Sequence, residues 1–229
     1  MKYSIVIPAY NEDGNIEELV NDIKKSCCGE HEIILVDDNS SDNTPEICDI
    51  LSKHKNISCI HRKKGDNGMG YALIDGTRWA KGDYIVWVMG DRSDKTDTID
   101  EIVKKLDEGY DMVIGSRYMN GADSGDLARD KAIYSSGYTL LARLIFGIPV
   151  HDITNAFRGF RKKVFQDITL ESGDFAISPE FAIKAQLRGY KLGEVPTTYT
   201  NRKAGKPKFS LIKMSIRYIS LFRYRLKSI

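Results

Sequence analysis

The sequence predicts an α/β protein with a mostly parallel central sheet flanked by helices, and three observations indicate this class. Apolar strand-like segments alternate with helix-like segments from residue 3 to residue 115. The segment 84–89 is an apolar run between Asp83 and Gly90, as expected of a strand buried on both faces. Polar clusters follow the first two predicted strands, at the edge where open α/β sheets place their binding crevice.

The predicted elements follow one another in a regular order. Strands are expected at 3–8, 32–36, 57–61, 84–89 and 112–115, and helices at 14–27, 44–53, 70–81 and 98–106. Because a helix separates most successive strands, right-handed βαβ units are expected. The predicted domain spans 1–208, and a basic amphipathic helix is predicted for 209–229.

The polar clusters after the first two strands are candidates for ligand binding. Tyr10 and Glu12 follow the first strand, and Asp38 follows the second. A carboxylate there can accept hydrogen bonds from a nucleobase or a ribose hydroxyl, and a tyrosine ring offers a flat face to a base. The alternative for residues 39–42 is capping of the helix that begins near Thr44.

Two acids follow the apolar run at 84–89. Asp91 and Asp94 could hold Mg²⁺, which prefers oxygen ligands and is often bound by one or two carboxylates together with substrate phosphates. The alternative is that Asp91 caps a helix beginning near Thr96 while Asp94 is exposed on the loop.

Several protein classes are excluded by composition and motifs. The content of 41% hydrophobic and 29% charged residues is ordinary for a globular protein. The cysteines at 27, 28, 48 and 59 form no C-x-x-C pair, which favours reduced thiols in a cytosolic compartment over disulfides or a zinc site. No signal peptide or bilayer-spanning apolar run is apparent. The G-x-G-x-x-G and P-loop motifs are absent, and no nucleic-acid partner is expected.

Positive charge is concentrated at the end of the chain. Of the 34 basic residues, nine follow Glu194, and no acidic residue does. In the helix predicted at 209–229, Lys213 and Arg217 share one face, while Ile216 and Ile219 lie largely elsewhere. This pattern suits a helix on an anionic membrane surface, and equally one packed on the protein's own core.

Certain segments are informative in combination: 8–12 (PAYNE), 36–44 (VDDNSSDNT), 68–70 (GMG), Asp91 after its strand and 115–118 (GSRY). Together they resemble the family 2 glycosyltransferases of GT-A fold. Segments 147–158 (GIPVHDITNAFR), 194–196 (EVP) and 202–208 (RKAGKPK) are similar to the dolichyl-phosphate mannosyltransferase and polyprenyl-phosphate glycosyltransferase branch. The GMG segment is expected to permit close backbone packing at a helix start.

The resemblance implies an inverting glycosyltransferase. It would move a sugar from a nucleoside-diphosphate sugar, GDP-mannose or a UDP-hexose, to a polyprenyl or dolichyl phosphate, with Mg²⁺ or Mn²⁺ as cofactor. A phosphate monoester, with a second pKa near ~6, is already an anion at neutral pH, so the enzyme's task becomes positioning and charge stabilisation. A lipid acceptor also implies peripheral attachment to the cytoplasmic face of an anionic membrane.

The resemblance further assigns roles to individual residues. The donor nucleotide would be held by Pro8, Ala9, Tyr10, Glu12, Val36 and Asp38, and the metal by Asp91 with Ser93 or Asp94. The acceptor phosphate would be held by Arg117, Lys131, Ser135 and Arg202. Asp91, Arg117 and Arg202 are the expected catalytic residues.

The sequence departs from the family pattern at three places. The family's D-x-D reads Met89-Gly90-Asp91, so the first acid is missing and weaker metal binding is expected. Lys131 stands where arginine is usual. Pro207 stands where serine is common, in a loop at 203–208 expected to close over the donor.

Two alternatives to this function stay open. One is a family 2 transferase with a glycan hydroxyl acceptor, which would need a general base, and Asp152 is the candidate. The other is a catalytically weak module that binds nucleotide sugars or membranes.

Overall fold

A computed structural model describes residues 2–201 and 211–226. In chain order the elements are β1 (Tyr3–Ala9), α1 (Ile16–Ser26), β2 (His31–Asp37), α2 (Thr44–Ser52), β3 (Ile57–His61), α3 (Met69–Trp79), β4 (Tyr84–Trp87), α4 (Thr98–Asp107), β5 (Met112–Ser116), α5 (Arg129–Phe146), β6 (Arg158–Arg161), α6 (Lys162–Asp167), α7 (Ile177–Leu187), β7 (Leu192–Pro196), α8 (Leu211–Ser220) and the 3₁₀ helix η1 (Leu221–Arg225).

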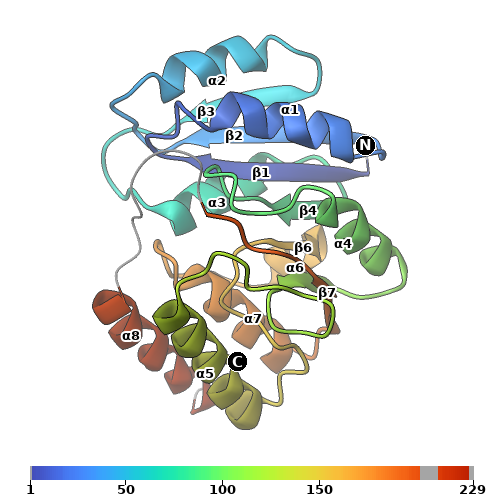
Figure 1. Ribbon diagram of the computed structural model, residues 1–229, viewed down its shortest axis with the longest axis vertical. Helices are drawn as coiled ribbons and strands as arrows, with labels where there is room; N and C mark the ends of the chain where they lie inside the picture. Colours follow the sequence, from blue (N-terminus) through green and yellow to red (C-terminus); the bar gives the residue numbers. More distant parts are fainter. Residues whose placement is uncertain (1, 202–210, 227–229) are drawn as a thin grey trace.

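A seven-stranded sheet in the order β3-β2-β1-β4-β6-β5-β7 forms the centre of the molecule (Figure 1). All paired strands are parallel except β6, which runs antiparallel to both β4 and β5. The predicted class, a mostly parallel sheet flanked by helices, is therefore confirmed. The carboxyl ends of β1, β2, β4 and β5 share one edge, where the polar clusters gather.

Helices cover both faces of the sheet and enclose two apolar cores. Buried side chains of α1, α2 and α4 form one core with one face of the sheet. Those of α3, α5, α6, α7, α8 and η1 form the other. Both faces are thus shielded from water, which explains why β1 is buried along its whole length and reads as an apolar run.

One aromatic cluster anchors the second core. The Trp87 ring lies edge-on to Phe160 at 5.1 Å between centroids, and Phe160 in turn lies edge-on to Phe181 at 4.8 Å. The indole N–H of Trp87 donates to the hydroxyl of Thr77 over 2.9 Å, so the buried polar group has a partner. This cluster joins β4, β6, α3 and α7 beneath the carboxyl edge of β4.

The two glycines at the start of α3, Gly68 and Gly70, have the role expected from the sequence. Gly68 has φ +145°, and the N–H of Gly70 donates to the carbonyl of Gly173 over 2.8 Å. A Cβ atom on Gly70 would lie 2.3 Å from the carbonyl oxygen of Ser172, which leaves no room for a side chain. The start of α3 therefore packs directly against the backbone before α7.

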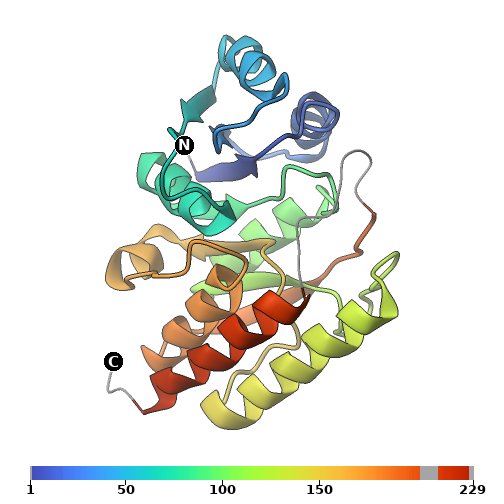
Figure 2. The ribbon, with the colours of Figure 1, turned by 90° about the vertical axis from the view of Figure 1, so that its left-hand side faces the viewer.

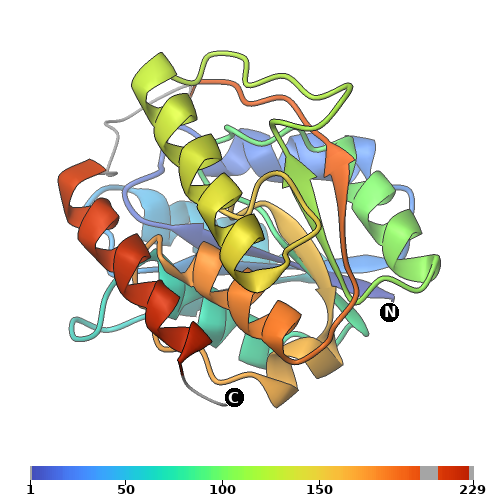
Figure 3. The same ribbon diagram turned by 90° about the horizontal axis from the view of Figure 1, so that it is seen from below.

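The C-terminal helix lies alongside α5, as Figures 2 and 3 show. Met214, Tyr218, Leu221 and Tyr224 are buried in the second core. The Tyr138 ring of α5 contacts that of Tyr218 at 4.8 Å between centroids. This helix is thus packed on the protein's own core, while the predicted boundary at 208 lies outside the described residues.

Candidate active site

A cleft of about 700 Å³ opens at the carboxyl edge of the sheet. It is bounded by the loops after β1, β2, β4 and β5, the start of α3, and parts of α5 and α8. The predicted site residues that line it are Pro8, Ala9, Tyr10, Glu12, Asp38, Asp91, Ser93, Arg117, Lys131 and Ser135. Residues assigned to three different roles therefore face one continuous space.

The loops after β1 and β2 brace one another at one end of this cleft. Asn11 and Asn39 adopt positive φ values of 53° and 62°, which asparagine tolerates better than most residues. The N–H of Asn11 donates to the Ser40 hydroxyl over 3.0 Å, and the Asn11 side-chain oxygen accepts from the N–H of Ser41 over 2.8 Å. These contacts fix the positions of Tyr10 and Glu12 relative to the second loop.

The Asp38 carboxylate is already engaged by several donors. It accepts from the Asn67 side chain over 2.9 Å, from the Gly68 N–H over 2.7 Å and from the Arg62 guanidinium. Arg62 is itself held by Asp75 at 2.7 Å. Asp38 thus positions the loop between β3 and α3 besides facing the cleft.

One residue assigned to the nucleotide does not reach the cleft. Val36 is fully buried in the core shared with α3, where its side chain lies close to Gly76. Strand β2 is covered on both faces, so the apolar pattern alone does not reveal which strand residues face a ligand. The nearest cleft residue on this strand end is Asp38.

The two acids after β4 face different spaces. Asp91 lines the cleft, and its carboxylate accepts from the N–H of Ser93 over 3.1 Å. Asp94 instead lines a separate depression next to Thr198 and accepts from the N–H of Met89 over 2.9 Å. Arg92, which lies between them in the sequence, adopts a positive φ of 61°. Burial raises the pKa of the Asp94 carboxyl to about 7, and the charge of Asp91 adds to the rise.

The residues present fit a divalent cation at Asp91. A single carboxylate, with Ser93 also lining the cleft, suits an ion that takes its other ligands from a bound diphosphate and water. Asp94 would have to leave Met89 to contribute. Met89 lines the cleft but offers no oxygen from its side chain.

Arg117, which also lines the cleft, forms a bidentate ion pair. Its Nε and Nη2 donate to the two carboxylate oxygens of Asp152 over 2.7 and 3.0 Å, and Nη2 also donates to the Thr154 hydroxyl over 2.9 Å. Asp152 has no exposed surface and does not line the cleft. Its carboxylate and the nearby charges raise the pKa of Arg117 despite burial, which by itself lowers it.

This arrangement removes support for Asp152 as a general base. Both of its oxygens are engaged by Arg117, and one of them also accepts from the N–H of Asn155 over 3.2 Å. A hydroxyl acceptor in the cleft has no access to a fully buried carboxylate. Asp152 is therefore a positioning residue for Arg117.

Lys131 and Ser135 come from successive turns of α5. The Ser135 hydroxyl donates to the carbonyl of Lys131 over 2.8 Å and also contacts the Tyr118 hydroxyl. Tyr118 lies next to Arg117, whose guanidinium is 5.4 Å from its ring centroid. Arg202 and residues 203–208 lie outside the described residues.

Some cleft residues were not identified from the sequence: Lys64, Asn67, Tyr134, Thr154, Asn155, Asp174, Phe175, Tyr199, Asn201 and Tyr218 are examples. Tyr134 and Tyr218 lie on α5 and α8, where their rings stack at 5.9 Å between centroids, so no local motif links them to the strand ends. Arg158 was also missed as a structural residue. It is fully buried, and its guanidinium donates to the carbonyls of Ser178 and Ile153 over 2.7 and 3.0 Å.

A membrane-spanning helix is not found among residues 2–201 and 211–226, where each helix is too short or too polar to cross a bilayer.

Comparison with known proteins places the chain in a family. The model of glycosyl transferase family 2 matches residues 4–169. A dolichol-phosphate mannosyltransferase of Pyrococcus furiosus is 33% identical over 213 residues, covering 91% of this chain and 59% of the relative. A polyprenol monophosphomannose synthase of Mycolicibacterium smegmatis is 29% identical over 214 residues, covering 90% of this chain and 80% of the relative. The chain thus spans less than two thirds of the Pyrococcus relative.

Solved structures share the fold at low sequence identity. Glucosyl-3-phosphoglycerate synthase from Mycobacterium tuberculosis, crystallised with Mn²⁺ and UDP-glucose, gives a TM-score of 0.76 at 20% identity, covering 98% of this chain and 78% of that one. S. aureus TarS with UDP gives 0.68 at 19% identity, covering 99% and 65%. The fold is the GT-A fold of glycosyltransferases. With the family model matched over most of the sheet, the chain belongs to glycosyl transferase family 2 and is a glycosyltransferase.

Proposed function

We propose that this glycosyltransferase moves a sugar from a nucleoside-diphosphate sugar to a polyprenyl phosphate, with inversion at the anomeric carbon. The observation that carries the proposal is that Asp91 and the cationic residues Arg117 and Lys131 line one cleft. Such a cleft can accommodate two phosphate-bearing substrates, and the names of the two relatives favour the same acceptor class.

The donor nucleotide is assigned to the end of the cleft formed by the loops after β1 and β2. Tyr10 is 45% exposed and supplies a ring for a base, while Glu12 and Asp38 supply carboxylate oxygens for ribose or base N–H groups. Pro8 and Ala9 also line the cleft. GDP-mannose is the first donor to test, with UDP-hexoses next.

The diphosphate is assigned to the neighbourhood of Asp91 and Ser93. Mg²⁺ or Mn²⁺ bound there would neutralise the charge that develops on the leaving diphosphate. The protein's own contribution is to hold Asp91 at the strand end, where the Ser93 N–H bonds its carboxylate. Crystals of the tuberculosis synthase contained Mn²⁺ or Mg²⁺ with UDP, which supports this choice of ion.

The acceptor phosphate is assigned to Arg117, Lys131 and Ser135, with Arg202 as a further candidate. An acceptor phosphate that is already anionic needs no general base, and Arg117 and Lys131 supply positive charge to the cleft lining. Asp152 fixes the orientation of Arg117, so the guanidinium need not be ordered when the phosphate binds. One phosphate oxygen would then attack the anomeric carbon as the nucleoside diphosphate leaves from the opposite face.

A lipid acceptor requires that the cleft meet a membrane, and exposed apolar side chains support this. Helix α5 exposes Ile133, Leu140, Leu141 and Leu144, and the neighbouring α8 exposes Ile216 and Ile219. These six residues, here called the apolar surface, lie on the two helices that also supply Lys131 and Tyr218 to the cleft (Figure 2). We assign peripheral attachment to the cytoplasmic face of an anionic membrane to this surface.

The test is sugar transfer by the purified chain from GDP-mannose, UDP-glucose and UDP-N-acetylglucosamine to a short polyprenyl phosphate, with Mn²⁺ or with chelator. Polyprenol of the same length is the matched control acceptor. We expect metal-dependent product from one donor with the phosphate only. Product with the free alcohol would instead indicate a hydroxyl acceptor, and nucleotide binding without any product would indicate an inactive binding module.

A further inference from the structure

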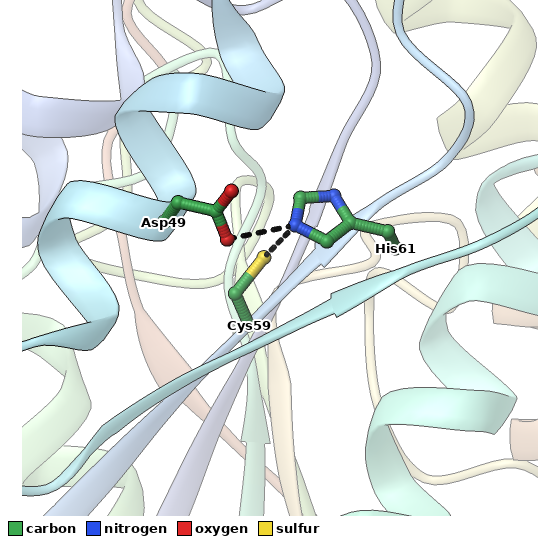
Figure 4. A group of neighbouring side chains, drawn as sticks. All are labelled: Asp49, Cys59 and His61. Carbon is green, nitrogen blue, oxygen red and sulfur yellow. Dashed lines mark hydrogen bonds and ion pairs between the residues drawn. The ribbon is translucent and has the colours of Figure 1, made fainter.

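Three side chains with metal-binding atoms meet outside the cleft, at the edge of the sheet. Cys59 and His61 are two residues apart on the edge strand β3, so their side chains point to the same face of the sheet. Helix α2 lies over this face and contributes Asp49 (Figure 4). The Nε2 atom of His61 lies 3.0 Å from Oδ1 of Asp49 and 3.5 Å from Sγ of Cys59. All three ligand atoms lie within 4.8 Å of one another.

The histidine ring is oriented from its other side. Its Nδ1 atom lies 3.0 Å from the carboxylate of Asp37, which is 3% exposed at the end of β2. Asp37 is held in turn by the N–H of Ser40 over 3.1 Å. A carboxylate behind a histidine is the usual support of a metal-binding imidazole, because it fixes the ring and makes the outward nitrogen a better ligand.

Two of the three ligand spacings are close to those of a tetrahedral zinc ion. With Zn–S near 2.3 Å, Zn–N near 2.0 to 2.1 Å and Zn–O near 2.0 to 2.2 Å, neighbouring ligand atoms lie ~3.6 Å apart for S and N and ~3.3 Å apart for N and O. The distances of 3.5 and 3.0 Å differ from these values by a few tenths of an ångström, which small side-chain rotations supply.

We propose that Asp49, Cys59 and His61 form a binding site for Zn²⁺, with the fourth coordination position open to solvent. A thiolate and an imidazole favour zinc over Mg²⁺ or Ca²⁺, which prefer sites made of oxygen. Asp49 and His61 are exposed, so an ion can enter directly. The sequence-based expectation of no zinc site considered only cysteine spacing, whereas this site contains one cysteine.

The environment of Cys59 favours its thiolate. A hydrogen bond from the buried Cys48 thiol lowers the pKa of Cys59, and the neighbouring His61 charge lowers it further. In the metal-free protein Asp37 and then Asp49 raise the pKa of His61 to about 9, so a proton on Nε2 bridges to Asp49. Binding of Zn²⁺ would release that proton and the Cys59 thiol proton.

The competing interpretation is a hydrogen-bonded ion pair that only ties α2 to β3. It makes no use of the sulfur. A metal probe that reports sulfur ligation therefore distinguishes the zinc site from the ion pair. It gives no such signal from a metal bound by oxygen atoms at Asp91.

The experiment treats the full chain with chelator and then titrates Co²⁺, whose thiolate complexes absorb strongly in the near ultraviolet. We expect one equivalent of Co²⁺ to produce this absorption and Zn²⁺ to displace it. Cys59→Ser should abolish the absorption, whereas Cys28→Ser and His54→Gln, at exposed positions elsewhere, should retain it. Asp91→Asn should also retain it.

A second variant guards against a Cys59→Ser protein that fails to fold. Asp49 is 67% exposed in its side chain, so Asp49→Asn should leave the circular dichroism spectrum unchanged. It should weaken Zn²⁺ binding by at least ~10-fold, measured by competition with Co²⁺. No sulfur-ligand absorption in the wild-type chain, equal absorption in Cys59→Ser, or unchanged affinity in Asp49→Asn would each overturn the proposal.

Discussion

The guanidinium of Arg117 and the carboxylate of Asp152 form two parallel hydrogen bonds, of 2.7 and 3.0 Å, at a place where Asp152 has no contact with solvent. The pair joins the loop after β5 to the loop before β6. One partner lines the cleft and the other does not. The Arg117 guanidinium therefore faces the cleft in an orientation that Asp152 has already fixed.

Changing Arg117 to lysine tests this geometry. Lysine keeps the charge but cannot pair with both oxygens of Asp152, so we expect Arg117→Lys to lower the turnover of sugar transfer by ~100-fold. Steady-state kinetics with saturating donor and acceptor measure the effect. Arg188→Ala, at an exposed position after α7, is the control and should retain full turnover.

Removing Asp152 tests stability as well as catalysis. Asp152→Ala leaves the largely buried Arg117 charge without its partner, so the free energy of unfolding should fall by about 3 kcal/mol in urea titrations. An unchanged free energy of unfolding would contradict the role of Asp152 as the buried partner of Arg117.

The two acids after β4 should behave differently. Asp91→Asn removes the carboxylate that lines the cleft, and we expect transfer to fall by ~100-fold. Asp94→Asn keeps an oxygen that can accept from the Met89 N–H, so its transfer should stay within about twofold of wild type. Initial rates across a Mn²⁺ series measure both variants. Equal losses in the two variants would place Asp94 among the metal ligands.

The difference between these acids shows where prediction from sequence stops. Strands in the first half were predicted because each is a local apolar run. Once the end of a strand is located, the acid that follows it in the sequence is located too. Whether Asp94 joins Asp91 depends on the left-handed backbone of Arg92, which no local pattern reveals. Val36 was assigned to the nucleotide by resemblance, yet its side chain faces the core.

Contacts between distant parts of the chain also could not be predicted from the sequence. Arg117 and Asp152 were each identified, but for separate hypotheses, because their pairing depends on β6 entering the sheet antiparallel between β4 and β5. The apolar positions of α5 and α8 do not reveal which of them pack together and which stay exposed, since that is decided by the ring contacts of Tyr138 with Tyr218 and Phe222.

Substitution by alanine should have opposite effects on stability at two glycines, Gly70 at the start of α3 and Gly137 within α5. A Cβ on Gly70 would meet the backbone of Ser172, which cannot move easily, so Gly70→Ala should lower the free energy of unfolding by about 2 kcal/mol. Gly137, within α5, has open space around it, so Gly137→Ala should raise the free energy by roughly 0.5 to 1 kcal/mol. Urea titrations measure both. A neutral Gly70→Ala would show that this contact is not tight.

The apolar surface predicts binding to lipid vesicles. Leu144 and Ile216 are 76% and 70% exposed on neighbouring helices, and burying each in a bilayer interface would contribute roughly 1.5 to 3 kcal/mol. We expect the double variant Leu144→Glu and Ile216→Glu to bind vesicles containing anionic lipid at least ~10-fold more weakly in sedimentation assays. The matched control is Ile50→Glu with Trp79→Glu, which adds the same charge at apolar positions 58% and 61% exposed on α2 and α3.

The same variants separate attachment from catalysis. A short, water-soluble acceptor phosphate needs no membrane, so the Leu144 and Ile216 double variant should transfer sugar to it at the wild-type rate. Its transfer to a long acceptor in vesicles should fall in proportion to the lost binding. If both double variants weaken vesicle binding equally, the effect is one of net charge. The cleft would then receive its acceptor by another route than the surface formed by α5 and α8.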